Sequence, residues 1–319
     1  MAGLRRRTFV STALAGAAAA GVGVLGAACS PGSEGTVPAG EGSLSGGPGE
    51  GAVQRHKYQY GEDPSQFGEL YLPELPDGGA RRGVVVVIHG GYWRSQYGAE
   101  LGEPLAKDLA AHGMAAWNLE YRRAGNGGGW PNTFADVLAG IDKLADLAAD
   151  HSLDLDRVVA LGHSAGGHLA VWAAGRARLA QLGLPDADRQ VLRISGSGAV
   201  RLAGVVSQSG LLNLAEAQKL DLSNGAVSNL LGGSSSKFPL RLRYADPMTA
   251  IPLDVPVHVV HGAADTTVPL SQSESYAAAA VAAGMTVRLT KVPGDHYDLI
   301  DPKSAAYREC RELVRQLLG

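Results

Sequence analysis

Three residues of the types used in nucleophilic catalysis stand far apart in this sequence. Ser164 lies in a Gly-His-Ser-Ala-Gly run over residues 162–166, and Asp265 and His296 follow it further along the chain. Acyl transfer needs a nucleophile, a base that takes its proton, and an acid that orients the base. The sequence therefore predicts Ser164 as nucleophile, His296 as base and Asp265 as the orienting acid.

Apolar runs precede each of these residues. Val158–Leu161 comes before Ser164, Val257–His261 before Asp265, and Thr286–Val292 before His296. Short apolar runs of this kind, separated by helical patterns, are typical of buried parallel strands. The separations along the chain fit two and then one strand–helix units. We therefore expect all three side chains at the carboxyl ends of neighbouring strands.

Other acids near His296 are weaker candidates for the orienting role. Asp295, Asp298 and Asp301 are close to His296 in sequence. An acid so near along the chain cannot easily reach Nδ1 of the imidazole from across the site. Asp265 is the preferred partner for this reason.

The remaining histidines are given structural roles. His163 is expected to point away from the nucleophile turn and to pack or hydrogen-bond locally, and His168 to lie on a helix surface or a pocket wall. His258 and His261 are three positions apart on a strand, hence on opposite faces. The sequence shows no metal-ligand set, and no metal or cofactor is expected.

A second glycine turn supplies candidate donors for an oxyanion. The β-branched run Val84–Ile88 predicts a buried strand, and it leads into a His-Gly-Gly turn. Backbone N–H groups of Gly90, Gly91 and Tyr92 could bind the developing charge together with the N–H of Ala165. Ala165 opens the helix after the nucleophile, where the helix dipole also favours negative charge.

The side chains around this turn carry further expectations. His89 is expected to hold the turn through a hydrogen bond and not to act as a base. Tyr92 and Trp93 are candidates for the wall of an acyl pocket. Core packing is the alternative for Trp93.

Residues 1–28 are predicted to be an export signal. Arg5–Val10 resembles a twin-arginine motif, and the following stretch is uncharged and rich in alanine and glycine. Leu25–Cys29 resembles a lipobox with Cys29 as the lipidation site; plain cleavage at an Ala-x-Ala-like site and a disordered tail are the alternatives. We expect export, with the protein extracellular or anchored to the membrane through that lipid alone.

Residues 29–53 are predicted to be a disordered Gly/Ser/Pro linker, and residues 54–319 the catalytic domain. Strands that alternate with helices indicate an α/β fold with a mainly parallel sheet. Thr133-x-x-Asp136 and Ser271-x-x-Glu274 resemble helix capping boxes.

Two stretches interrupt the strand–helix alternation. They span Gln181–Val200 and Gly210–Pro256. Insertions at strand ends are typical of lids or pocket walls, and surface decoration is the alternative. We expect them to form a small lid.

Charge and cysteine content exclude some classes of protein. The net charge is −3, and residues 1–28 contain three Arg and no acids, so the remaining chain carries 25 basic and 31 acidic side chains. This balance argues against a nucleic-acid partner. Of the two cysteines, Cys29 lies at the predicted processing site and Cys310 in the last predicted helix, which argues against a disulfide framework.

Several motifs resemble the α/β-hydrolase superfamily, in the branch of hormone-sensitive-lipase-like esterases, feruloyl-esterase-like proteins and arylformamidases. Residues 89–93, His-Gly-Gly-Tyr-Trp, are similar to the His-Gly-Gly-x-Trp motif of kynurenine formamidases, and residues 162–170 look like the nucleophile elbow of the branch. Residues 120–122, Glu-Tyr-Arg, resemble its Asp-Tyr-Arg. The resemblance runs from about Phe67 to the C-terminus and implies an eight-stranded sheet flanked by helices.

Three functions follow from these observations. The first is a serine carboxylesterase that cleaves small acyl esters through an acyl-enzyme intermediate. The second is an amidase that acts on an aryl formamide or a short peptide. The third is a non-catalytic binding lipoprotein with the same fold, which the presence of every triad and oxyanion position argues against. A small ester or amide is the expected partner in the first two.

Overall fold

The computed structural model describes residues 42–44, 53–74, 82–194 and 199–319. All of them belong to one compact unit, residues 39–319. The predicted export signal, Cys29 and most of the predicted linker lie outside the described residues.

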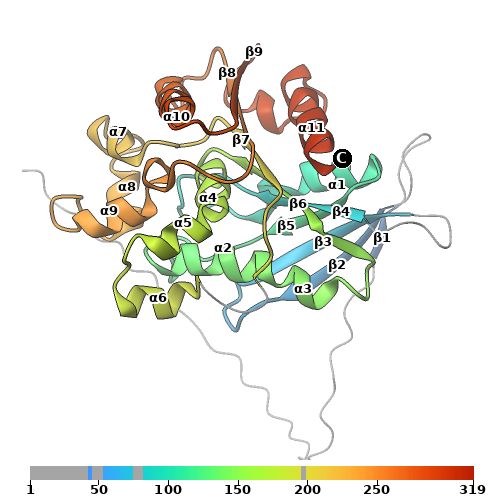
Figure 1. The fold of residues 1–319 in the computed structure, drawn as a ribbon. Helices are drawn as coiled ribbons and strands as arrows, with labels where there is room; N and C mark the ends of the chain where they lie inside the picture. The colour runs from blue at the N-terminus through green and yellow to red at the C-terminus, as the bar shows by residue number, and fades with distance from the viewer. Residues whose placement is uncertain (1–41, 45–52, 75–81, 195–198) are drawn as a thin grey trace, which may run out of the picture. The chain divides into compact units, whose positions relative to one another are not determined.

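One nine-stranded sheet forms the centre of this unit, in the order β1-β2-β3-β5-β4-β6-β7-β8-β9 (Figure 1). From β5 to β9 all neighbours run parallel, while β1, β2 and β3 are joined to the sheet by antiparallel pairs. The strands are β1 Gly42–Leu44, β2 Val53–Gln59, β3 Phe67–Pro73, β4 Arg82–Ile88, β5 Ala115–Leu119, β6 Leu153–His163, β7 Gly204–Gln208, β8 Val257–Gly262 and β9 Val287–Val292.

Helices cover both faces of the sheet (Figure 1). The α-helices are α1 Glu103–Ala111, α2 Asn132–Asp142, α3 Leu144–Leu147, α4 Ala165–Ala174, α5 Arg176–Gln181, α6 Asp186–Leu192, α7 Leu214–Lys219, α8 Ala226–Leu231, α9 Pro239–Ala245, α10 Ser271–Ala282 and α11 Ala305–Leu318. Short 3₁₀ helices are η1 Ala99–Leu101, η2 Pro247–Ala250 and η3 Asp298–Ile300. None of the helices in the described ranges is long and apolar enough to cross a membrane.

The central strand β4 divides the core into two layers. Val84, Val86 and Ile88 face the larger cluster, to which α2, α4 and α10 contribute, while Val85 and Val87 face the cluster that includes α1 and α11. Successive side chains of a strand point to opposite faces, so an unbroken β-branched run fills both layers. The predicted parallel α/β architecture is confirmed.

Strand register brings the predicted site residues to one edge of the sheet. Ile88 at the end of β4 is level with Leu119 of β5 and with Gly162 of β6. The next residues along each chain segment, His89, Glu120 and His163, therefore leave the sheet side by side. This register places the glycine turn next to the nucleophile.

The eight expected strands correspond to β2–β9, and β1 is an addition. It lies inside the predicted linker and pairs with β2 as an antiparallel edge strand, with Leu44 opposite Val53. Pairing of an edge strand uses backbone groups, which the hydrophobic pattern of a short segment does not report. Val53, assigned to the linker, begins β2.

Both predicted capping boxes are wrong. Helix α2 begins at Asn132 and α10 at Ser271, and neither has a side-chain cap bond. Thr133 and Asp136 bind the loop after β5 instead, and Glu274 pairs with Lys291 at 2.7 Å. Tertiary partners compete successfully with the local cap in each case.

Candidate active site

Ser164 stands in the turn between β6 and α4. Its backbone angles are φ 53° and ψ −118°, a conformation that is strained for a residue with a side chain. Ser164 N donates to Gln208 O of the neighbouring strand at 2.8 Å, which ties the turn to the sheet. The turn places the residue at the end of β6, where the nucleophile of this motif is found.

The two glycines of the motif are needed because backbone passes close to them. A Cβ on Gly162 would lie 2.2 Å from Gly166 O, and one on Gly166 would lie 2.0 Å from Ile88 O. Neither neighbour is a flexible side chain. Glycine at both positions therefore lets β6, α4 and the end of β4 approach each other around Ser164.

Asp265 and His296 meet as the sequence predicts. His296 Nδ1 lies 2.7 Å from Asp265 Oδ2, and both side chains are almost completely buried. Asp265 follows β8 and His296 follows β9, so each comes from the carboxyl end of its strand. This bond orients the imidazole and leaves Nε2 as the nitrogen available for proton transfer.

Hydrogen bonds fix Asp265 as an ionised group. Burial would raise its pKa, but the bond from His296, the backbone N–H of Val268 and the hydroxyl of Ser209 together lower it to about 2. Thr267 N and Val268 N donate to Oδ1 at 2.8 and 2.9 Å. The carboxylate can therefore stabilise a positive charge on His296 during proton transfer.

The nearer acids serve the turn that carries His296. Asp295 Oδ1 accepts from Tyr297 N at 2.7 Å, and Asp298 Oδ2 accepts from Asp295 N at 2.7 Å. These bonds shape the loop after β9. Asp265 is thus the acid that contacts His296 Nδ1, as the sequence analysis preferred.

His163 joins the nucleophile turn to the base. Its Nε2 donates to the main-chain oxygen of His296 at 2.9 Å, and the two ring centroids are 4.5 Å apart. Burial, and then the neighbouring His296, lower the pKa of His163 to about 3, so the ring is neutral at neutral pH. The expectation of a local bond is corrected: the partner lies 133 residues away in sequence.

His168 also differs from expectation. It is fully buried, and its Nε2 donates to Ala245 O at 2.8 Å. The carbonyl belongs to α9, which the pattern of the α4 helix could not reveal. His168 is therefore an internal tie to the second insertion and not a surface or pocket-wall residue.

The glycine turn after β4 lies against the nucleophile. A Cβ on Gly90 would be 3.0 Å from both Ser164 Cβ and His163 O. Gly91, Tyr92 and Trp93 all have positive φ, at 105°, 50° and 55°. Positive φ at three consecutive residues is uncommon and bends the backbone sharply after β4.

Ala165 supplies the other expected donor. It is the first residue of α4, so its backbone N–H has no partner within the helix. Of the four predicted oxyanion positions, Gly90 and Ala165 lie next to Ser164, and Gly91 and Tyr92 continue the turn that begins at Gly90.

The two residues predicted to line an acyl pocket, Tyr92 and Trp93, differ in their exposure. Tyr92 is partly exposed, and its hydroxyl donates to Thr267 O at 2.7 Å, which links the glycine turn to the Asp265 loop. Trp93 is 0% exposed and packs edge-on against His168, with ring centroids 5.0 Å apart. Trp93 belongs to the core, which is the alternative that the sequence analysis gave for it, and does not line a pocket.

Two exposed aromatic rings near the site were missed by the sequence analysis. Tyr297 is 62% exposed, and its ring is perpendicular to that of His296 at 5.4 Å between centroids. Tyr97 is 39% exposed and packs on Gly91, where a Cβ would lie 2.5 Å from Tyr97 Cβ. The position of Tyr297 directly after His296 was the available signal.

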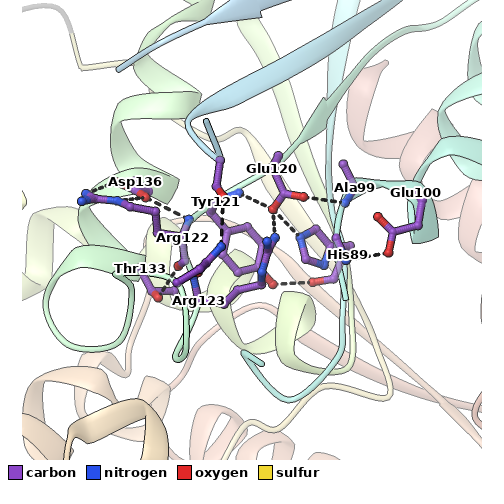
Figure 2. Close-up of polar contacts among 12 residues, drawn as sticks. His89, Ala99, Glu100, Glu120, Tyr121, Arg122, Arg123, Thr133 and Asp136 are labelled. Carbon is purple, nitrogen blue, oxygen red and sulfur yellow. Dashed lines mark hydrogen bonds and ion pairs between the residues drawn. The ribbon is translucent and has the colours of Figure 1, made fainter. Parts of the chain in front are cut away.

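A buried polar network surrounds His89 at the start of the glycine turn (Figure 2). Glu120 Oε1 lies 3.2 Å from His89 Nε2 and accepts from Tyr121 N at 2.8 Å, while Oε2 accepts from Ala99 N at 2.8 Å. Arg123 Nη1 also pairs with Oε1. His89 is therefore structural, as expected.

A second buried carboxylate holds the same loop on its other side (Figure 2). Asp136 accepts from Arg122 N, Nε and Nη2 at 2.7–2.9 Å, and from Gln66 Nε2 at 2.7 Å. Thr133 Oγ1 donates to Arg122 O at 2.6 Å. These contacts anchor the start of α2 and do not touch the glycine turn.

The two insertions differ in their relation to the site. In the Gly210–Pro256 segment, Leu211 N donates to Ser164 O at 3.4 Å, and Ser223 O accepts from Arg94 of the glycine turn. Helix α6, within Gln181–Val200, packs against α2. Across the described ranges, no group of three or more His, Cys, Asp and Glu side chains could hold a metal ion.

Comparison with known proteins identifies relatives of this chain. The BD-FAE family model matches residues 69–279. The chain is 28% identical over 256 residues to isoprenylcysteine alpha-carbonyl methylesterase ICME of Arabidopsis thaliana and 27% identical over 251 residues to esterase LipQ of Mycobacterium tuberculosis. Each match covers 77% of this chain and 57% of the relative, so the chain spans little more than half their length.

A solved structure shares the fold. An inhibited esterase B from Lactobacillus rhamnosis superposes with a TM-score of 0.70 at 23% identity, over 83% of this chain and 86% of that one. At this identity the likeness establishes the architecture, which is that of the α/β-hydrolases.

Proposed function

This chain belongs to the BD-FAE family, and from that membership and the geometry of its site we propose that it is a serine carboxylic-ester hydrolase. The observation that carries the proposal is the 2.7 Å bond from His296 to Asp265, with Ser164 on a strained turn tied to His296 through His163. The names of its relatives, a methylesterase and an esterase, support ester substrates.

We assign one role to each group. His296 Nε2 takes the proton of Ser164 as the hydroxyl attacks the ester carbonyl, and Asp265 stabilises the imidazolium that forms. Backbone N–H groups of Ala165 and of the Gly90–Tyr92 turn donate hydrogen bonds to the carbonyl oxygen as negative charge develops on it. His296 then protonates the departing alcohol and activates the water that releases the acid.

Covalent labelling tests this proposal. The full chain is treated with a fluorophosphonate probe beside a Ser164→Ala variant, and hydrolysis of short-chain p-nitrophenyl esters is measured for both. We expect labelling and turnover in the parent and neither in the variant. A folded parent protein that is neither labelled nor active would refute the hydrolase proposal, and turnover of N-formylkynurenine in preference to esters would redirect it to an amidase.

We also propose that residues 1–28 direct export and that Cys29 carries a lipid. Support comes from Arg5–Arg7, the uncharged stretch that follows, and the small residues before Cys29. Mass spectrometry of the protein from bacterial membranes tests this, with a Cys29→Ser variant as control. A mature N-terminus without a lipid mass would contradict the anchor.

A further inference from the structure

Glu120 carries a buried negative charge outside the catalytic triad. It is 5% exposed, and four nitrogen atoms converge on its carboxylate: His89 Nε2, Tyr121 N, Arg123 Nη1 and Ala99 N. The two carboxylate oxygens accept the N–H groups of Tyr121, Arg123 and Ala99, and His89 Nε2 lies 3.2 Å from Oε1. The register of β4 and β5, with Ile88 level with Leu119, places Glu120 directly beside His89.

His89 holds the glycine turn and is itself held by Tyr121. Its Nδ1 lies 2.8 Å from Gly90 O, and because a carbonyl oxygen only accepts, that nitrogen is the donor. On the opposite face Tyr121 stacks on the ring with centroids 4.4 Å apart, and the Tyr121 hydroxyl donates to His89 O at 2.8 Å. Burial lowers the pKa of His89 to about 3, so the neutral ring carries its single proton on Nδ1 and its Nε2 does not donate to Glu120.

The Gly90 carbonyl determines where the next N–H points. In a trans peptide the C=O of one residue and the N–H of the following residue point in opposite directions. With Gly90 O held by His89, the Gly91 N–H points away from the imidazole. Gly90 itself lies against Ser164, where a Cβ would be 3.0 Å from Ser164 Cβ.

Glu120 also holds the segment that covers Gly91 from the other side. Its Oε2 accepts from Ala99 N at 2.8 Å, and a Cβ on Gly98 would lie 2.5 Å from that oxygen. One residue earlier, Tyr97 packs on Gly91. One carboxylate thus holds both Tyr121, beside His89, and Ala99, as Figure 2 shows.

We propose that Glu120 is a positioning residue that acts through Tyr121 and the Ala99 segment to orient the Gly90–Gly91 peptide, so that the Gly91 N–H faces the oxyanion formed at Ser164. The inference rests on the proposed hydrolase function. Glu120 does not touch substrate, and it acts by fixing a donor before the reaction begins, which is the feature that makes an oxyanion site effective.

The test compares two amide variants of the full chain. In Glu120→Gln the amide has one acceptor oxygen, so its NH₂ must face at least one of the donors. Asp136→Asn is the matched control, because Asp136 is 1% exposed and also receives four N–H groups from the same loop region, without contact to the glycine turn. Tyr121→Phe removes a single bond to His89 and keeps the ring, so it serves if Glu120→Gln does not fold.

The readouts are kcat and KM for p-nitrophenyl propionate, the inhibition constant of an alkyl trifluoromethyl ketone, and Tm. The ketone adduct carries an oxyanion, so its affinity reports the donor directly. For Glu120→Gln we expect kcat to fall about 10- to 100-fold, ketone affinity to fall by the same factor, and KM to stay within about threefold. Tyr121→Phe should lose about 3- to 10-fold in the same two quantities.

Asp136→Asn should lower Tm comparably but leave kcat and ketone affinity within about threefold of the parent. The inference is wrong if Glu120→Gln loses no more kcat and ketone affinity than Asp136→Asn, or if its loss is in KM alone. Should Glu120→Gln not fold, unchanged ketone affinity in Tyr121→Phe refutes it. A parent protein without esterase turnover or fluorophosphonate labelling would instead refute the hydrolase function, so the two failures are distinct.

Discussion

Replacing His163 with phenylalanine would remove one hydrogen bond while keeping a ring in the same buried space. In the parent, Nε2 donates to the main-chain oxygen of His296 at 2.9 Å and the rings lie 4.5 Å apart. Phenylalanine retains the ring contact but has no donor. The loop that carries the base therefore loses its tie to the nucleophile turn.

The size of the effect follows from that carbonyl. A buried acceptor left without its donor costs about 1–3 kcal/mol. In a domain of this size each kcal/mol lowers Tm by about 2–4 °C, so we expect a fall of about 2–12 °C. A displacement of about 1 Å in a catalytic group can cost about 100-fold in rate, and we expect kcat to fall about 10- to 100-fold with KM within about twofold.

Glutamine at position 163 is the matched control. Its side-chain N–H has a reach similar to that of the imidazole Nε2, so His163→Gln should keep kcat within about threefold of the parent. The assays are turnover of p-nitrophenyl propionate and thermal unfolding, with NMR of the proton between His296 and Asp265 as a measure independent of turnover. Full activity of His163→Phe, or equal losses in both variants, would refute the reasoning.

Three further outcomes are expected. The pKa of Asp265 is about 2 in the folded protein, against about 3.9 in the unfolded chain, so its charge stabilises the fold above about pH 4 and this contribution is lost as pH falls toward 2. In denaturant titrations over this pH range, the free energy of unfolding should fall by about 2 kcal/mol more for the parent than for Asp265→Asn. Equal falls in the two proteins would contradict this expectation. Burial raises the pKa of the fully enclosed Cys310 thiol to about 12. In a Cys29→Ser variant, Ellman's reagent should therefore react with Cys310 at pH 8 only after the protein is unfolded. Rapid reaction of the native protein would show that the thiol is accessible. Gly166→Ala would place a Cβ 2.0 Å from Ile88 O, so fluorophosphonate labelling should fall more than about 100-fold, and normal labelling would mean that the turn can move aside.

The strands and the meeting of Asp265 with His296 could be predicted because their signals are local. The five residues Val84–Ile88 are enough to predict a buried strand. The glycines around Ser164 predict a turn in which backbone segments pass close to each other. The chain order Ser164, Asp265, His296 then needs only the rule that parallel strands end at one edge. Each step uses composition within a few neighbouring positions, which the sequence contains in full.

The contacts that support the site depend on register and could not be read in this way. Glu120 meets His89 because Leu119 and Ile88 are level in the sheet, and His163 meets His296 across 133 residues. Trp93 shows that even a residue inside a recognised motif can be misplaced by sequence reasoning, since its φ is positive and its ring is buried in the core. A shift of one residue in strand pairing would leave the sequence pattern unchanged and separate these side chains.

The sequence by itself therefore determined the α/β architecture and the residues expected to perform the chemistry. The tertiary structure decided which side chains hold them in place: the Glu120 carboxylate beneath the glycine turn, the His163 bond to the base, and the diversion of Thr133 and Asp136 from helix capping to the Arg122 loop. Hydrophobic periodicity records which face of an element is buried. Hydrogen-bond partners between distant segments are set by how those faces come together.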